Sequence, residues 1–472
     1  MTHLRKILPF ILSVGLWMHN INAVAQVPDT LSPEALREIV LRNHPVAKQA
    51  DIIIQKAKAD ISIARAGFDP VLQHQQSEKT FDGTAYYRYS QPELKIPTWF
   101  GIDLVAGTEN LSGNRTDPQE TKGRSNYAGI SIPLVKNLLM DKRRAALKTA
   151  QLFKSASELE KKAMLNDLLY ESMNAYWHWV SCFQDYLLMR DVVKVNQQRM
   201  EWVVKTYQLG ERPAIDTIEA LSQLQSFQFA ESQALLEFKN ATILLSAYLW
   251  NGNGEPVILP DQVIPAKSIL EQDAFALQLP QQEALVRTAL LMHPELKQYD
   301  YKLSALGIEK RLKFQDMLPV VNFKYNQLGK GYDLLKQTGP LFQNNFRYGI
   351  SVSMPLRLSE GRGGYRKAQL KLKETQWDQE LKSLRIVNKI KTAFNEMETL
   401  RSQLHLQETA FRNFNRLLKA EETRLLAGES SLFLVNAREN KALEARQKWQ
   451  QLRIKFLKSL VSVQWAAGQL FQ

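Results

Sequence analysis

Cysteine is almost absent from this chain, and so are the long apolar runs that mark membrane-spanning helices. The 472 residues include one cysteine, Cys182, which excludes an intramolecular disulfide. We interpret Cys182 as a buried apolar thiol because it lies beside an apolar helical seam. After residue 25 no apolar run is long enough for a spanning helix. Any crossing of a membrane would therefore need strands closed into a barrel.

Motifs of catalysis and metal binding are missing as well. The sequence has no HExxH, P-loop or GxSxG motif. None of the histidines after residue 25 lies at metal-ligand spacing from another candidate ligand: His44, His74, His178, His293 and His405. A cluster at residues 176–179 could form a ligand pocket, but we favour aromatic packing along a helix. We expect neither an enzyme nor a cofactor or metal site.

The first 25 residues have the pattern of a secretory signal peptide. Arg5 and Lys6 precede the apolar run 7–17, and small residues at 23 and 25 offer a cleavage site before Gln26. No cysteine follows that site, so we expect no lipid anchor there. Without the two cations of this segment, 59 basic residues face 48 acidic ones. In a secreted chain we interpret this excess as solvated helix faces, and we expect no nucleic-acid partner.

Glycine and proline are missing from one unusually long stretch, residues 136–209, which Gly210 closes. Apolar residues recur in it at alternating spacings of four and three, as in a coiled coil: Leu169, Met173, Tyr176, Val180, Phe183 and Leu187. A helix of this length would measure about 110 Å, which no compact domain can bury. Other long helices, from this chain or from copies of it, must cover the seam.

The landmarks of the chain occur twice in the same order. Three short motifs return at a constant offset: Glu34-Ala35-Leu36, His44-Pro45 and Pro70-Val71 reappear at 283–285, 293–294 and 319–320. A second breaker-free run also ends in Gly428-Glu429, as the first ends in Gly210-Glu211. The chain is therefore a tandem duplication of helix, strands, long helix, tight turn and return helix. We expect the His-Pro pairs to be structural turns or kinks.

This duplication predicts the domain organisation. The parts are a signal peptide at 1–25, a first repeat at 26–250, an equatorial linker at 251–282 and a second repeat at 283–472. In the first repeat, a helix of about 35 residues after Ser32 precedes strands at about 70–134, a long helix at 136–209 and a return helix at 214–250. In the second repeat, strands at about 319–356 precede a long helix at 362–427 and a return helix at 430–467. The first helix and the return helix are each about half as long as the long helix. We therefore expect the linker between the repeats to lie near the middle of the long helices.

The strand segments alternate apolar and polar side chains, as at Val321, Phe323 and Tyr325. An ordinary sheet with one buried face would show the same pattern. The signal peptide and the length of the helices favour a barrel with lipid outside and water within. One chain offers four strands, or six if 71–79 and 85–94 form an extra hairpin. Either number is too small to close a pore, so we expect an oligomer.

A basic turn, Lys142-Arg143-Arg144, begins the long helix near the strands. Two interpretations stay open: a contact with anionic lipid head groups, and a solvated basic turn, which we favour.

In these features the chain resembles the TolC family of outer-membrane efflux and export channels. The resemblance rests on the His-Pro pairs, on Phe68-Asp69-Pro70 before the strands, on Pro-Leu after them at 133–134 and 355–356, and on the glycines at 210 and 428. It implies an α+β membrane protein that forms, as an oligomer, a transmembrane β-barrel continuous with a long periplasmic α-helical coiled-coil tunnel. It further implies a homotrimer and a twelve-stranded barrel in the outer membrane.

The resemblance also implies partners and site residues. A periplasmic adaptor (a membrane fusion protein) and an inner-membrane RND or ABC pump would dock at the tip turns, Gly210, Glu211, Gly428 and Glu429. Asp216 matches an acidic position that helps to close the tunnel, although a first-turn charge at a helix N-terminus would look the same.

The sequence departs from the family pattern around the second tip. The usual arginine partner of Asp216 would fall at Ser430, and an expected tyrosine falls at Leu425. Positions 434 and 437, where some members place an acidic ring, are Leu434 and Ala437. Cation selectivity from such a ring is therefore not supported.

We thus expect the outer-membrane channel component of a tripartite export system. It would passively conduct substrates from a pump and adaptor through periplasm and outer membrane to the exterior, and the sequence does not choose the substrate. The alternative is a periplasmic coiled-coil scaffold or adaptor without a pore. That alternative accounts for the helices and the charge but not for the alternating strands.

Overall fold

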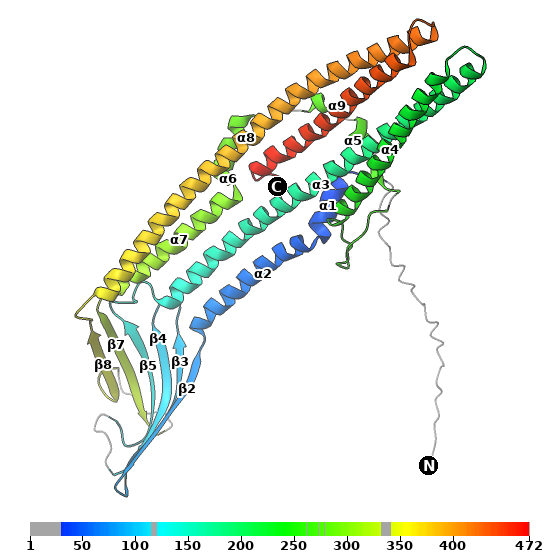
Figure 1. Ribbon diagram of the computed structural model, residues 1–472. Coiled ribbons are helices and arrows are strands. Elements are labelled where there is room, and N and C mark those ends of the chain that lie inside the picture. The colour runs from blue at the N-terminus through cyan, green and yellow to red at the C-terminus, as the bar shows by residue number, and fades with distance from the viewer. Residues whose placement is uncertain are drawn as a thin grey trace, which may run out of the picture.

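The computed structural model describes residues 30–471 except residues 115–119, 261, 272, 278 and 332–340. The signal peptide predicted at residues 1–25 lies outside the described residues. Figure 1 shows an elongated molecule in which long helices run side by side and a sheet extends from one end of them. Among the helices of the described ranges, none is both long and apolar enough to cross a membrane.

Two helices of nearly equal length form the main axis of the molecule. Helix α3 (Lys142–Gln208) has 67 residues and α8 (Ser359–Leu426) has 68, which makes each about 100 Å long. Helix α3 begins later than the predicted residue 136 because Asn137 takes a φ of 71° and the Asp141 side chain caps the helix by accepting a hydrogen bond from the Arg144 N–H. Helix α8 begins before the predicted residue 362, since its early glycines lower helix propensity without ending the helix.

Each long helix folds back into a shorter antiparallel partner. Helix α3 leads to α4 (Ala214–Ser246) and α8 leads to α9 (Leu432–Ala466), and each pair packs together. Gly210 and Gly428 carry the chain through the two tip turns with φ values of 77° and 79°. This left-handed backbone region favours glycine. The glycines that close the breaker-free stretches are therefore the residues that make the turns.

The first helix of each repeat is divided in two at its His-Pro pair. The segments are α1 (Pro33–Asn43) and α2 (Pro45–Arg65) in the first repeat, and α6 (Gln282–Met292) and α7 (Pro294–Gln315) in the second. At each break the ring Nδ1 of His44 or His293 accepts a hydrogen bond from the N–H two residues later. A residue before proline avoids the helical conformation. The predicted kinks are confirmed, and a single helix after Ser32 is wrong.

The linker crosses the helices near the middle of their length (Figure 1). Its elements are β6 (Ile264–Pro265), α5 (Lys267–Glu271) and the 3-10 helix η2 (Ala274–Ala276). Strand β1 (Thr30–Leu31) comes before the first repeat's helices and lies beside β6. Strands β1 and β6 pair in parallel. The Arg453 guanidinium of α9 donates to the carbonyl oxygens of Ile269 and Leu270. Leu259 and Val263 are buried in the helical core, so the linker is fixed to both repeats.

The main hydrophobic core lies where the linker crosses α3. Tyr176 and Trp179 are fully buried there. The Tyr176 hydroxyl donates to the Leu31 carbonyl at 2.9 Å, and Trp179 Nε1 donates to Thr242 Oγ1 at 3.0 Å. The interpretation of this aromatic cluster as packing is confirmed. Cys182 lies in the same core, where burial raises the pKa of its thiol to about 11, as expected of a buried apolar thiol.

The sheet at the other end is antiparallel, and the described residues form six strands in it. The strands, in the order in which they lie side by side, are β2 (Val71–Phe81), β3 (Thr84–Pro97), β4 (Asp103–Ser112), β5 (Gly123–Pro133), β7 (Val320–Lys330) and β8 (Phe346–Ser353). A short 3-10 helix, η1 (Ala66–Phe68), connects α2 to β2. Strand β5 pairs with β7, so one sheet contains strands of both repeats.

The two repeats contribute unequally to this sheet. The first repeat supplies four strands because the extra hairpin, which the sequence left open, is present as β2 and β3. Asp82 and Gly83 turn it with positive φ values of 49° and 70°, as two-residue hairpin turns require. Among the described residues, each chain therefore contributes six strands to this sheet, not the four on which a twelve-stranded trimer depends.

Candidate functional site

The sheet has one apolar face and one polar face. Directly opposed residues of antiparallel strands lie on the same face, and the register aligns Ile96 with Leu104, Leu104 with Ile130 and Ile130 with Tyr325. We call this side the apolar face; it also carries Leu94, Ala106, Phe323, Ile350 and Val352. Val352 is 68% exposed and Ile350 60%. An exposed apolar band of this kind fits contact with lipid.

The polar face carries a hydrogen-bonded network that joins three strands. The Tyr127 hydroxyl donates to Glu93 Oε2 at 2.6 Å and accepts from Gln91 Nε2 at 2.8 Å. Gly107 lies opposite Tyr127 in the register. A Cβ at Gly107 would lie 2.7 Å from the Tyr127 hydroxyl oxygen, so the missing side chain leaves room for the phenol ring to reach Glu93.

A second network on the polar face joins β4 to β8. Arg347 Nη2 lies 2.8 Å from Glu109 Oε1, and its Nη1 lies 3.1 Å from Glu120 Oε2. Lys95 and Asp103 form a further ion pair at 3.0 Å. The polar face therefore holds charges of both signs, arranged in pairs that cross strand boundaries. This is the composition expected of a wall that faces water.

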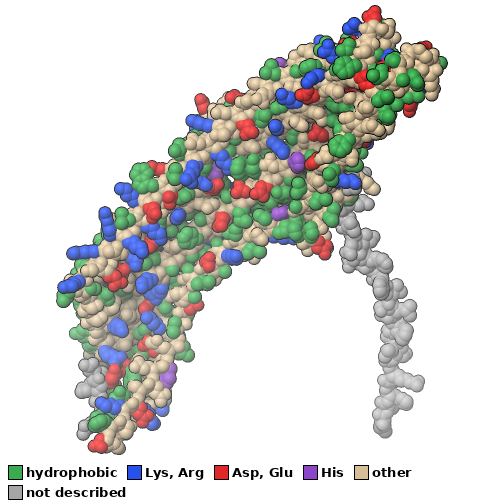
Figure 2. Space-filling model, viewed as in Figure 1, with side chains coloured by type: hydrophobic (Ala, Val, Ile, Leu, Met, Phe, Trp, Pro, Cys, Tyr) green, Lys and Arg blue, Asp and Glu red, His purple; other side chains and the backbone are tan. Residues whose placement is uncertain are grey.

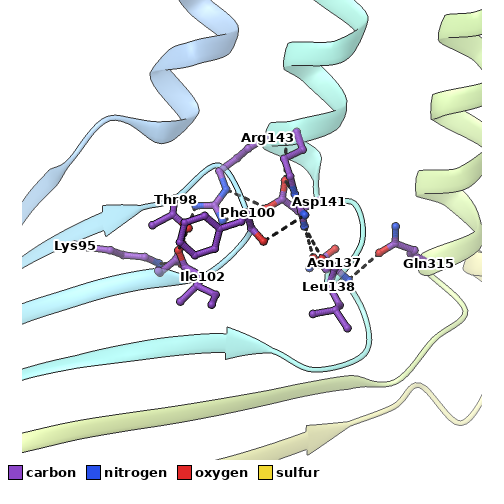
Figure 3. A network of polar contacts seen from close by, with 11 residues as sticks. Lys95, Thr98, Phe100, Ile102, Asn137, Leu138, Asp141, Arg143 and Gln315 are labelled. Atoms are coloured by element: carbon purple, nitrogen blue, oxygen red, sulfur yellow. Dashed lines mark hydrogen bonds and ion pairs between the residues drawn. The ribbon is translucent and has the colours of Figure 1, made fainter.

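Where the sheet meets the helices, a polar network fixes the start of α3 (Figure 3). Arg143 Nη1 donates to Asp103 Oδ1 at 2.9 Å, and Nη2 donates to Asp141 Oδ2 at 3.1 Å. Arg144 Nη2 donates to the carbonyl oxygens of Asn137 and Leu138 at 2.6 and 3.0 Å. The guanidinium groups thus bind a strand, a helix cap and a loop together.

For Arg143 and Arg144 this junction overturns the solvated interpretation that we favoured for the basic turn at 142–144, whereas Lys142 is exposed. The side chains of Arg143 and Arg144 are 27% and 15% exposed, and both are bound within the fold. Neither is a solvated charge or a free lipid contact. Gln315 of α7 accepts from the Asn137 N–H at 2.8 Å, so the second repeat is joined here too. Asp141 beside the turn was a local signal for a helix cap, but no local sequence pattern indicates the contact of Arg143 with Asp103 on β4.

The predicted docking residues lie at the end of the molecule opposite the sheet (Figure 1). Gly210, Glu211, Gly428 and Glu429 are all exposed on the two tip turns. Large apolar side chains beside them are exposed as well: Leu209, Ile215, Leu426 and Phe433. Figure 2 shows hydrophobic side chains at this end with acidic and basic side chains among them. Docking at these turns stays a prediction.

Asp216 lies in the first turn of α4 and is paired within its own chain. Arg212 Nη1 lies 3.0 Å from Asp216 Oδ2, and the same guanidinium lies over the Trp202 ring, 4.5 Å from its centroid. Ser430, at the position of the arginine in the family pattern, donates to Glu421 Oε1 at 2.6 Å. The first-turn position is established, and the role of Asp216 as a tunnel gate stays a prediction.

Sequence reasoning missed a buried ion cluster near the tips. Arg199 of α3 lies 2.6 Å from Glu439 of α9 and 3.3 Å from Glu422 of α8. Asn196 Nδ2 also donates to Glu439 Oε1 at 3.2 Å. The side chains of Arg199 and Glu439 are only 11% and 9% exposed. Because the partners come from three helices, no local sequence pattern indicates the cluster.

These features define the class of protein. A sheet with one exposed apolar face and one networked polar face, continued by helices of about 100 Å, has the architecture of an outer-membrane channel subunit. Among the residues that the structure describes, no group of three or more His, Cys, Asp and Glu side chains could hold a metal ion. Residues 285–469, most of the second repeat, match the family described as outer membrane efflux protein. No curated protein matches the sequence.

Solved structures of outer-membrane channels share the fold over nearly the whole chain. The CmeC outer membrane channel of Campylobacter jejuni is 15% identical, with 93% of this chain and 86% of CmeC covered and a TM-score of 0.62. VceC, an outer membrane protein of Vibrio cholerae, is 14% identical, with 93% and 97% covered and a TM-score of 0.62. The open-state MtrE channel of Neisseria gonorrhoeae is 14% identical, with 92% and 88% covered and a TM-score of 0.63. At such identities the likeness is one of fold.

The family match and the shared fold confirm the resemblance to the TolC family of outer-membrane channels. The predicted α+β fold class, with a long helical part and a barrel-type sheet, is confirmed with it. The predicted location in the outer membrane with a periplasmic extension agrees with the descriptions of the matched family and of these solved structures. The matched family is one of channels and not of enzymes.

Proposed function

We propose that this chain is one subunit of a homotrimeric outer-membrane channel that forms the exit of a tripartite export system. Substrates pass passively from an inner-membrane pump and a periplasmic adaptor, through the helical tunnel and the barrel, to the exterior. The sheet carries the proposal, because its apolar face is exposed while its edge strands, β2 and β8, have no further partner strand in the described part of the chain. A sheet in hydrocarbon has to close, and six strands of one chain are too few to enclose a water-filled pore.

The helices support assembly from several copies. One side of α4 carries large apolar side chains that a single chain leaves exposed: Phe229, Leu236, Ile243 and Leu244. Phe229 is 75% exposed. Contiguous exposed apolar surface on a secreted protein marks an interaction site. Helices of neighbouring copies would cover it and complete the wall of the tunnel.

The tips are the proposed docking site for the adaptor, a membrane fusion protein that couples the channel to an RND or ABC pump. The glycine turns present backbone and the carboxylates of Glu211 and Glu429 to solvent, surrounded by exposed apolar side chains. Such a mixture of apolar and polar groups suits a helix-tip contact with another periplasmic protein.

Membrane fractionation and conductance test the proposed function. The full chain, expressed with its signal peptide, should stay in outer membranes washed with high salt and should need detergent for release. The purified oligomer should conduct ions across a planar bilayer. A protein that high salt releases from the membrane, and that does not conduct, would instead be a periplasmic scaffold or adaptor without a pore.

Within this proposal, Asp216 constrains the tunnel near its periplasmic end. Asp216→Ala removes the ion pair with Arg212. Because this pair is little exposed, it holds the turn more firmly than a surface pair would, and its loss should loosen the turn. Single-channel conductance should therefore rise by about 1.5-fold or more. Glu211→Ala, which removes an exposed carboxylate at the same tip, serves as the control and should leave conductance unchanged. Equal conductance of Asp216→Ala and the unmodified channel would remove Asp216 from the gate.

A further inference from the structure

We propose that the hairpin β2–β3 is part of the channel wall and that β2 is the edge that pairs with β8 of a second copy of this chain, so that three copies close an eighteen-stranded barrel. This inference rests on the proposed function, because it assumes an oligomeric channel. The structure gives six strands in one continuous sheet. Four strands per chain, as the resemblance implies, would leave β2 and β3 outside the wall.

The hairpin pairs with the rest of the sheet, although its pairing with β4 is interrupted at Gln91 and Pro92. Strand β2 pairs with β3 from Val71 and Lys95 to Phe81 and Thr84. Strand β3 in turn pairs with β4 from Pro97 and Asp103 to Arg88 and Ser112. Because β3 is bonded along both of its edges, the hairpin is a continuation of the sheet and not a flap above it.

The apolar face extends into the hairpin. The register places Leu72 of β2 opposite Leu94 of β3, and Leu94 opposite Ala106 of β4. Leu72 is 78% exposed. Leu72 and Leu94 thus stand in the same row as Ala106 of β4, whereas the next residues of β2 on this face, His74 and Gln76, are polar. The apolar face therefore reaches the hairpin at the end of the sheet that is nearer the helices.

The polar face extends into the hairpin as well. Gln73 Nε2 of β2 donates to Glu93 Oε1 at 2.7 Å, and Glu93 is the residue that accepts from the Tyr127 hydroxyl of β5. One hydrogen-bonded chain therefore runs across the polar face from β2 to β5. Farther along the hairpin, Glu78 and Arg88 form an ion pair on the side of the apolar face. That part of the hairpin must project beyond the hydrocarbon layer.

The two edges of the sheet are complementary. Neighbouring strands alternate in direction, so with six strands β2 and β8 run antiparallel to each other. Among the described residues neither has a partner on its outer edge. Unpaired backbone groups are unfavourable in hydrocarbon because no water is present to hydrogen-bond them, and a second copy of this chain offers the matching edge. Barrel diameter grows roughly linearly with strand number, so eighteen strands give about 1.5 times the width of twelve.

Cysteine cross-linking tests which edge meets β8. The single native cysteine permits a clean background, Cys182→Ser. In that background Leu72→Cys on β2 is combined in turn with Tyr348→Cys, Ile350→Cys and Val352→Cys on β8, all on the apolar face. Oxidation in outer membranes should join at least one pairing into covalent trimers, with at least a tenfold excess over either single variant. The matched control replaces Leu72→Cys by Leu104→Cys on β4 and should give no cross-link.

Counting strands in the purified oligomer, by cryo-electron microscopy, decides the question independently of any chosen register. Eighteen strands with β2 next to β8 of the neighbour support the inference. Twelve strands, or cross-linking through Leu104 in place of Leu72, overturn it while leaving the oligomeric channel intact. A monomer released by high salt would instead overturn the proposed function itself.

Discussion

At the scale of single residues, the two His-Pro pairs show how one side chain can define a helix boundary. His293 lies between α6 and α7, and its Nδ1 accepts from the Glu295 N–H at 3.3 Å. The ring has to be neutral to accept there. Burial, followed by the positive charges of Lys389 and Lys382, lowers the pKa of His293 to about 4. Burial also lowers the pKa of His44 at the equivalent position.

This pKa predicts a loss of stability in acid. The pKa of a histidine in the unfolded chain is about 6.5, so as the pH falls the unfolded state takes up the proton first. The stability contributed by neutral His293 is complete above pH 6.5 and decreases toward pH 4, by about 2–3 kcal/mol. Thermal unfolding followed by circular dichroism should show a midpoint that falls over this interval. His293→Asn keeps a capping oxygen without a titrating ring, and its midpoint should fall less; equal slopes would contradict the assignment.

At the scale of helices and turns, the tip glycines are constrained by backbone geometry. Gly210 has a φ of 77°, and its N–H donates to the Tyr207 carbonyl at 2.9 Å. Gly428 has the same conformation. Proline fixes φ near −65° and lacks the N–H, so it is excluded on both counts.

Gly210→Pro and Gly428→Pro should therefore distort the tips and abolish export in cells while the sheet still inserts. Detergent-dependent extraction and unchanged trimer yield would confirm insertion, and efflux of a substrate would measure export. Gly210→Asn is the control, because asparagine tolerates the left-handed region, and it should keep most export. Normal export by the proline variants would count against docking at the tips.

The ion cluster of Arg199, Glu439 and Glu422 ties the tips of the two hairpins together. Removing one partner of a buried pair leaves an uncompensated charge and costs about 3–5 kcal/mol. Arg199→Ala should thus increase hydrogen exchange of the amides in both tips. The double change Arg199→Met with Glu439→Leu removes both charges and should restore most protection. Lys441→Ala is the control: it breaks the exposed pair with Glu444 and should have little effect on hydrogen exchange. Equal exchange in Arg199→Ala and in this control would show that the cluster does not hold the tips together.

At the scale of the whole molecule, the core around the linker aligns both repeats. Trp179 is fully buried against Phe238 and hydrogen-bonds to Thr242. Trp179→Ala should cost about 3–5 kcal/mol because it leaves a cavity and removes the hydrogen bond that Thr242 Oγ1 accepts. Chemical denaturation of the solubilised oligomer would measure the loss. Trp377→Ala on α8 is the control, because its indole is exposed, and it should change the free energy of unfolding by less than about 0.5 kcal/mol. Similar losses in the two variants would show that the core around the linker is not what holds the repeats together.

The sequence alone determined the features that depend on local backbone chemistry. Apolar spacing and the absence of breakers predicted the two long helices, the glycines at 210 and 428 predicted their turns, and the prolines after His44 and His293 predicted the kinks. Helix geometry and backbone sterics act within a few residues of chain, so a local pattern can report them. The duplicated order of these landmarks then led to the family.

Only the tertiary structure decided which distant groups meet. The hairpin β2–β3 was open in the sequence because Gln73 and its neighbours lack apolar alternation, and pairing with β4 settles it. Arg143 was interpreted as a solvated charge because Asp103, its partner, lies on another strand. Hydrogen bonds and ion pairs between remote segments depend on where the folded backbone places two atoms within about 3 Å. The order of residues along the chain does not indicate that distance.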